Sequence, residues 1–75
     1  MSSMEQILKQ MVEAQKKKLF DIAKRLVPKI TPEDLLQPQD YPELDSHPEF
    51  RYEEGVLAGL ESTLSAFYAN HREHL

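Results

Sequence analysis

The 75-residue sequence contains no cysteine, no tryptophan and only two glycines. Without cysteine, neither a disulfide bond nor a cysteine-ligated zinc ion can hold a small domain together. A chain of this length hides only about 60% of its unfolded surface when it folds alone, so its stability is marginal without such a link. The sequence therefore predicts one domain, residues 1–75, that relies on good helix packing or on oligomerisation.

Long apolar runs are missing as well. The longest apolar stretch, GVLAGL at residues 55–60, falls far short of the roughly 20 residues that span a bilayer. The first residues, MSSMEQ, have neither the basic start nor the apolar segment of a secretory signal peptide. We therefore expect a soluble, cytoplasmic protein with no membrane partner.

The chain also lacks an excess of positive charge, because its formal net charge is −4. Proteins that bind nucleic acids rely on lysine and arginine to neutralise phosphates. Residues 31–54 are especially acidic, whereas residues 1–30 carry most of the basic side chains. A nucleic-acid partner is therefore not expected.

A first helix is predicted over residues 2–26. Ser2 with Glu5, or Ser3 with Gln6, fits a capping box at its start, and Pro28 excludes helical geometry just beyond its end. Apolar residues recur at helical spacing and form one stripe. The stripe consists of Met4, Leu8, Met11, Val12, Leu19, Ile22, Ala23 and Leu26.

Gln15 interrupts the apolar stripe of this first helix near its centre. One interpretation is a surface glutamine at a hydrated part of the stripe. The other is a buried polar residue that fixes register or oligomeric state at a cost in stability. The second interpretation predicts that Gln15→Leu raises the melting temperature and broadens the distribution of oligomers.

A second helix is predicted over residues 49–72, with Ser46 and Glu49 as its capping box. At 100° per residue, one sector about 80° wide holds its large apolar residues, which are Leu57, Leu60, Leu64 and Phe67. Small residues form a second stripe about half a turn away, which consists of Gly55, Gly59, Ser62, Ala66 and Ala69.

The two glycines in this small-residue stripe each cost a helix roughly 1 kcal/mol relative to alanine. A helix with this cost usually packs closely against another backbone. The simpler alternative is that these residues face solvent. We favour contact on two sides of the helix, with the second side facing another chain.

The connector, residues 27–48, contains all five prolines of the chain and many acidic residues. Thr31 and Pro32 predict a short helix that carries Leu35 and Leu36 onto the long helices. The rest is expected to be extended or turn-like, pinned by Tyr41 and Leu44. A stiff acidic segment of this length is either a recognition surface or a solvated connector across one end of the fold.

The two long predicted helices have similar lengths, which suits an antiparallel pair. The sequence thus predicts an all-α fold: an antiparallel helical hairpin with a proline-rich connector that contains a short helix. Two copies are expected to pair into a four-helix bundle.

Few residue patterns point to chemistry. His71 and His74 are three residues apart and could meet one metal ion, but further ligands would have to come from Glu73, the connector or a second chain. Histidines near a helix C-terminus more often complement the helix dipole. No serine has the surroundings of a nucleophile, and no glycine-rich phosphate loop is present. We therefore expect no catalytic residue, cofactor, metal site or small-molecule substrate, and do not expect an enzyme.

The function that fits best is a small protein–protein interaction module: an adaptor, a regulator or a chaperone-like subunit. It is expected to form a homodimer or to bind a heteromeric protein partner through its amphipathic helices. The residues expected to make the contacts are Gly55, Leu57, Gly59, Leu60, Leu64 and Phe67. The alternative is a helical bundle that binds a metal or small ligand through its C-terminal histidines and acidic residues.

Overall fold

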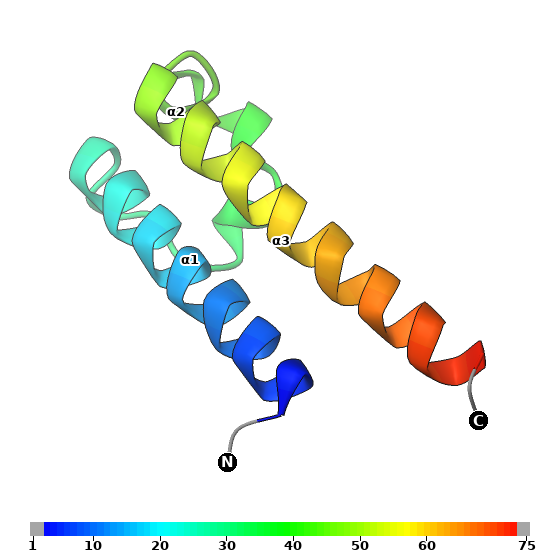
Figure 1. The fold of residues 1–75 in the computed structure, drawn as a ribbon. Coiled ribbons are helices and arrows are strands. Elements are labelled where there is room, and N and C mark those ends of the chain that lie inside the picture. Colours follow the sequence, from blue (N-terminus) through cyan, green and yellow to red (C-terminus); the bar gives the residue numbers. More distant parts are fainter. Residues whose placement is uncertain (1–2, 74–75) are drawn as a thin grey trace.

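The fold consists of two long helices joined by a connector of short helical turns (Figure 1). The structure, a computed structural model, describes residues 3–73. Helix α1 (Met4–Leu26) and helix α3 (Pro48–Glu73) pack against each other and run in opposite directions (Figure 1). Between them come the turns η1 (Asp34–Leu36) and η2 (Pro38–Asp40) and the short helix α2 (Pro42–Asp45). The described residues contain no strand, so the predicted all-α class is confirmed.

The start of α1 is fixed by the second of the two predicted capping boxes. The Gln6 backbone N–H donates to the Ser3 hydroxyl oxygen at 3.1 Å, and the Ser3 N–H donates to the Gln6 side-chain oxygen at 3.2 Å. The helix ends at Leu26, where the following Val27 N–H donates to the Ala23 carbonyl at 2.7 Å. The predicted first helix is therefore confirmed, with its start two residues later than expected.

The connector is more helical than the sequence suggested. The Thr31 N–H donates to the Asp34 carboxylate at 2.9 Å, and the Asp34 N–H donates to the Thr31 hydroxyl at 3.3 Å, which starts the expected short helix. The segment that follows, expected to be extended or turn-like, consists of turns. Pro38 and Pro42 each begin a further turn, because proline has no N–H to leave unpaired there and its φ already suits a helix.

Ser46 does not cap α3 as predicted. Its hydroxyl donates instead to the carbonyl of Pro42 at 2.8 Å, inside the turn that leaves α2. Helix α3 begins at Pro48, and the Arg51 N–H donates to the His47 carbonyl at 3.0 Å. The Ser46–Glu49 capping box is therefore wrong, because a serine can bond the carbonyl four residues earlier when a helical turn precedes it.

The core lies at the end of the molecule where the connector packs against α1 and α3. Leu44 and Phe50 are fully buried there, and Leu44 pins the connector as predicted. Leu35 packs against this core, but the side chain of Leu36 is 81% exposed, so the expectation that both leucines reach the long helices is wrong. Neighbouring residues in a single 3₁₀ turn point in different directions, and only one of them faces the core.

At the other end of the helix pair, no third layer is formed by the residues that the structure describes. Val12 is buried between the helices, but Met4, Ile7 and Met11 are 57%, 41% and 47% exposed. The apolar residues of α3 at this end, Leu60, Leu64 and Phe67, are only half-buried. A helix pair that is not covered by another layer leaves part of its apolar surface in water.

Candidate protein-interaction surfaces

The six predicted interaction residues divide into two groups in the structure. Leu57 packs against the core, and the other three large residues remain half-buried along the inner side of α3. Gly55 and Gly59 lie on the outer side, where a Cβ atom added to either would meet nothing within 4 Å. Neither α1 nor the connector therefore covers the glycines, and the binding role of these residues stays a prediction.

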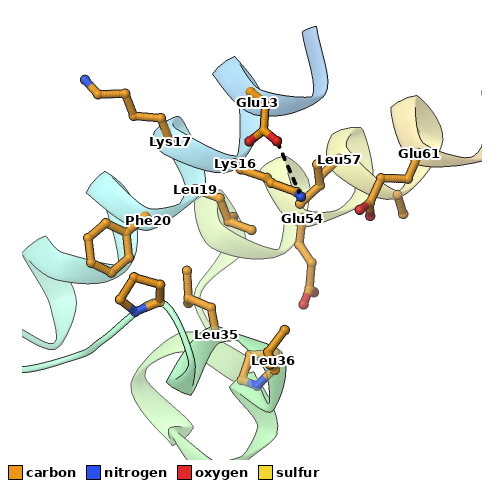
Figure 2. A pocket seen from close by; sticks show the side chains of 13 residues that line it. Glu13, Lys16, Lys17, Leu19, Phe20, Leu35, Leu36, Glu54, Leu57 and Glu61 are labelled. Carbon is orange, nitrogen blue, oxygen red and sulfur yellow. Dashed lines mark ion pairs between the residues drawn. The ribbon is translucent and has the colours of Figure 1, made fainter. Parts of the chain in front are cut away.

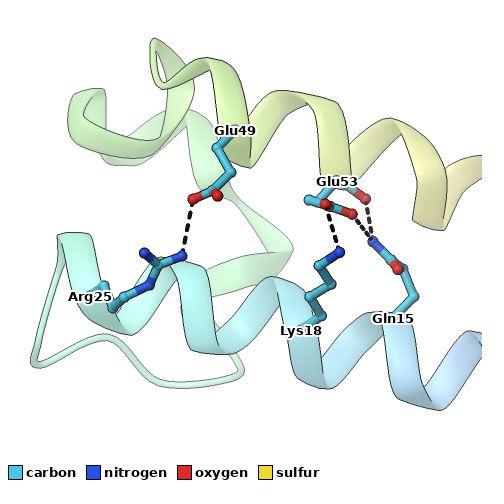
Figure 3. Close-up of polar contacts among 5 residues, drawn as sticks. All are labelled: Gln15, Lys18, Arg25, Glu49 and Glu53. Atoms are coloured by element: carbon cyan, nitrogen blue, oxygen red, sulfur yellow. Dashed lines mark hydrogen bonds and ion pairs between the residues drawn. The ribbon is translucent and has the colours of Figure 1, made fainter.

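A row of polar contacts marks one side of the α1–α3 pair (Figure 3). The Gln15 side-chain amide donates to the Glu53 backbone carbonyl at 3.0 Å and to its carboxylate at 2.8 Å. The Lys18 ammonium lies 2.9 Å from the other carboxylate oxygen of Glu53. Nearer the connector, Arg25 pairs with Glu49 at 3.0 Å. These bonds fix the axial position of α1 relative to α3.

Glu53 is the centre of this polar row and only 9% exposed. Its hydrogen bonds with Lys18 and then with Gln15 lower the pKa of its carboxyl group, against the opposing effect of desolvation. The same contact raises the pKa of Lys18. The sequence did not predict this contact, because only the packing of α1 brings Lys18 and Gln15 to Glu53.

The structure places Gln15 half-buried against α3, between the two interpretations of the sequence, and its hydrogen-bond partner belongs to the same chain. Its contact changes the expected effect of Gln15→Leu. The substitution removes two hydrogen bonds from the side chain and carbonyl of Glu53 without supplying a donor. We now expect the melting temperature to fall by roughly 5 °C instead of rising. Thermal unfolding followed by circular dichroism, with the exposed Gln10→Leu as matched control, would measure this, and a rise specific to Gln15→Leu would contradict it.

An apolar surface continues this row toward the end of the helix pair that the connector does not cover, which we call the open end. At 100° per residue, Met4, Ile7 and Met11 project from α1 on the same side as Lys18. Leu60 and Phe67 project from α3 on the same side as Glu49 and Glu53. We call the surface formed by Met4, Ile7, Met11, Leu60 and Phe67 the open face. The sequence assigned Met4 and Met11 to the core, but no connector residue reaches them.

The open end of the helix pair is held by polar contacts. The Tyr68 hydroxyl donates to the Glu5 carboxylate at 2.9 Å, and the Lys9 ammonium lies 3.2 Å from the same carboxylate. The tyrosine hydrogen bond, followed by the Lys9 contact, lowers the pKa of Glu5. Polar contacts therefore join α1 and α3 near both ends of the helix pair that forms the open face.

A groove follows the opposite side of the helix pair, between α1, α3 and the connector (Figure 2). Its volume is about 730 Å³, and Leu19, Phe20, Leu35 and Leu57 contribute apolar side chains to it. A second hollow of about 550 Å³ continues along the two helices as far as Tyr68 and shares Lys16 and Glu61 with the first. We call the two together the connector groove. The sequence did not predict it, because its walls come from three separate segments.

The histidines are not gathered into a metal centre in the part of the chain that the structure describes. The His71 ring stacks on Phe67, with ring centroids 6.1 Å apart and an interplanar angle of 8°. His74, its suggested partner, lies outside the described residues. Among the side chains that the structure describes, those of residues 3–71, no three His, Cys, Asp or Glu are placed to hold a metal ion. The side chain of Glu73, another suggested ligand, lies outside them.

Comparisons of the chain with protein-family models, curated proteins and solved structures give no match. Among the described residues, no helix combines the length and apolar character needed to cross a membrane. The open face, the exposed glycines and the connector groove are the candidate binding surfaces of the described residues.

Proposed function

We propose that the chain is a protein–protein interaction module that associates with a second copy of itself, as a binding protein and not as an enzyme. Two helical hairpins would pair through their open faces into a four-helix bundle. The observation that carries the proposal is the uncovered apolar surface at the open end. Burying exposed apolar side chains such as Met4 and Met11 between two copies supplies the third layer that the single chain lacks.

The exposed glycines support association on the same side of α3. At 100° per residue, Gly59 lies about 80° around α3 from Phe67, so the small-residue stripe borders the open face. A helix of the second copy that packs on Phe67 can therefore approach the α3 backbone at Gly59. This contact would account for two glycines that cost the helix stability, at positions where an added Cβ would meet no described atom within 4 Å.

The test is the solution mass, measured by light scattering across a dilution series for wild type and for Gly59→Leu. We expect a wild-type dimer whose dissociation constant rises roughly tenfold or more in the variant, because the leucine side chain separates the two backbones. Ala58→Leu is the matched control, since the neighbouring residue is also exposed but faces the connector groove. A wild-type protein that stays monomeric at every concentration would contradict the proposal.

Gly59→Ala adds a measurement in which folding and association move in opposite directions. The added methyl group meets nothing within 4 Å in the single chain, and alanine favours a helix by about 1 kcal/mol over glycine. We therefore expect a more stable monomer and a weaker dimer. A more stable monomer with an unchanged dimer dissociation constant would mean that the stripe faces solvent in the assembly too.

A further inference from the structure

The connector groove is a second surface, separate from the open face and the glycines. Leu36, the most exposed large apolar residue of the described chain, lines the part of it next to η1. Its side chain is 81% exposed and contributes almost nothing to the core. The groove therefore offers apolar walls at its base and one additional apolar side chain at its edge, all available to a ligand.

The two rims of the groove carry opposite charges at regular spacing. The α1 rim has an excess of basic residues, with Lys9, Lys16 and Lys17 beside one acid, Glu13. Glu54 and Glu61 line the α3 rim. The spacing concerns two pairs, Lys9 with Lys16 and Glu54 with Glu61. The two members of each pair are seven residues apart, which is two helical turns or roughly 10.5 Å. Heptad spacing of charges beside an apolar seam is the pattern by which one helix selects another in a coiled coil.

The acidic rim is more available than the basic rim for new ion pairs with a ligand. Glu54 lies 3.4 Å from Arg51, whereas Glu61 is exposed and forms no ion pair with the described side chains of residues 3–71. On the basic rim, Lys9 is paired with Glu5, and Glu13 lies 3.9 Å from Lys16. A positively charged group over Glu61 would thus form a new ion pair, while groups over the lysines would replace existing ones.

We infer that the connector groove binds an amphipathic helix of another protein, which carries basic residues on one flank and acidic residues on the other. Its apolar face would pack onto the half-buried Leu35 and Leu57 and the exposed Leu36. Its basic flank lies along Glu54 and Glu61 and its acidic flank along Lys9 and Lys16. The groove extends along α3 from Glu54 to Tyr68, roughly 21 Å, which accommodates about four helical turns.

The helices of this chain do not have the required charges, so the occupant is not a second copy. Helix α1 carries lysines on both flanks of its apolar stripe: Lys9 and Lys16 on one and Lys18 on the other. Helix α3 carries Glu54 and Glu61 on one flank and the exposed Glu49 on the other. Either helix, laid in the groove, would place like charges against one rim, which opposes binding.

Two synthetic leucine-faced peptides of about 15 residues test the inference. The mixed-flank peptide has glutamates along one flank and lysines along the other, and the acid-flank peptide has glutamates along both. Fluorescence anisotropy measures their binding to the full chain. We expect wild type to bind the mixed-flank peptide about tenfold more tightly than the acid-flank peptide. We expect the double variant Glu54→Lys with Glu61→Lys, whose rims are both basic, to reverse this preference.

Controls separate the groove from overall charge and from folding. The double variant Asp40→Lys with Glu43→Lys changes the net charge equally at exposed connector positions and must keep the wild-type preference. Glu61→Lys alone, at an exposed residue, should reduce the preference in the same direction. Leu36→Ser should weaken mixed-flank binding roughly tenfold and leave thermal unfolding unchanged.

Three results would overturn the inference: no saturable binding of the mixed-flank peptide, an unchanged preference in the lysine-rimmed variant, or the same reversal in the charge control. Self-association is read separately, in the dilution series without peptide. A dimer that persists in Gly59→Leu and dissociates in Ala58→Leu would place a second copy in the groove, and would contradict both this inference and the glycine contact.

Discussion

Replacing Phe50 with alanine is expected to lower the free energy of unfolding by about 3–5 kcal/mol. The ring is fully buried at the point where α3 enters the core, beside the equally buried Leu44. Its removal loses the transfer free energy of the ring and leaves a cavity that the surrounding helices fill only in part. A domain of this size has a total stability of about 4–11 kcal/mol, so the variant loses a large part of it.

The matched control for this experiment is Tyr52→Ala, two residues further along the same helix. The Tyr52 side chain is 70% exposed, so its removal is expected to change the unfolding free energy by no more than about 0.5 kcal/mol. Urea unfolding followed by circular dichroism would compare the two variants at one protein concentration. Similar losses for both would mean that the core does not lie at the connector end.

The second large effect is expected on acidification. The pKa of Glu53 is lowered in the folded chain by its contacts with Lys18 and Gln15. Its contribution to stability is therefore fully present above the unfolded pKa, about 4.3 for glutamate, and is lost as the pH falls below this value through the lower folded pKa. We expect Glu53→Gln to lose less stability than wild type between neutral and acidic pH.

Glu5 and Asp34 also have lowered pKa values, so wild type alone would not identify the responsible carboxylate. The comparison must therefore be between variants across the pH series. Glu61→Gln changes an exposed carboxylate of the same helix that forms no ion pair among the described residues. Its acid sensitivity should match that of wild type. Parallel stability curves for wild type and Glu53→Gln would show that the buried contact does not set the acid sensitivity.

The two proposed surfaces have different chemical characters and lie on different sides of α3. The open face consists of exposed apolar side chains next to glycines, which suits close packing of like surfaces. The connector groove has charged rims, which suits a ligand helix with a specific charge pattern. A module with both would join a dimerisation surface to a recognition surface within one small domain.

Local patterns in the sequence determined the elements of this protein. The Ser3–Gln6 cap and Pro28 delimit α1, and the apolar spacing of both long helices indicated which of their sides face each other. Thr31 and Pro32 located a short helix in the connector. These features depend on neighbours within one or two helical turns, so a single sequence is enough to predict them.

Only the tertiary structure decided which residues of these elements are buried and which remain exposed. Met4 and Met11 belong to the same apolar stripe as Ile22, yet only Ile22 is buried, because the connector packs over one end of the helix pair. The hydrogen bonds of Gln15 and the position of Leu36 follow from the same packing. Such contacts join residues 38 positions apart in the case of Gln15 and Glu53, a separation at which helical periodicity carries no information about spatial neighbours.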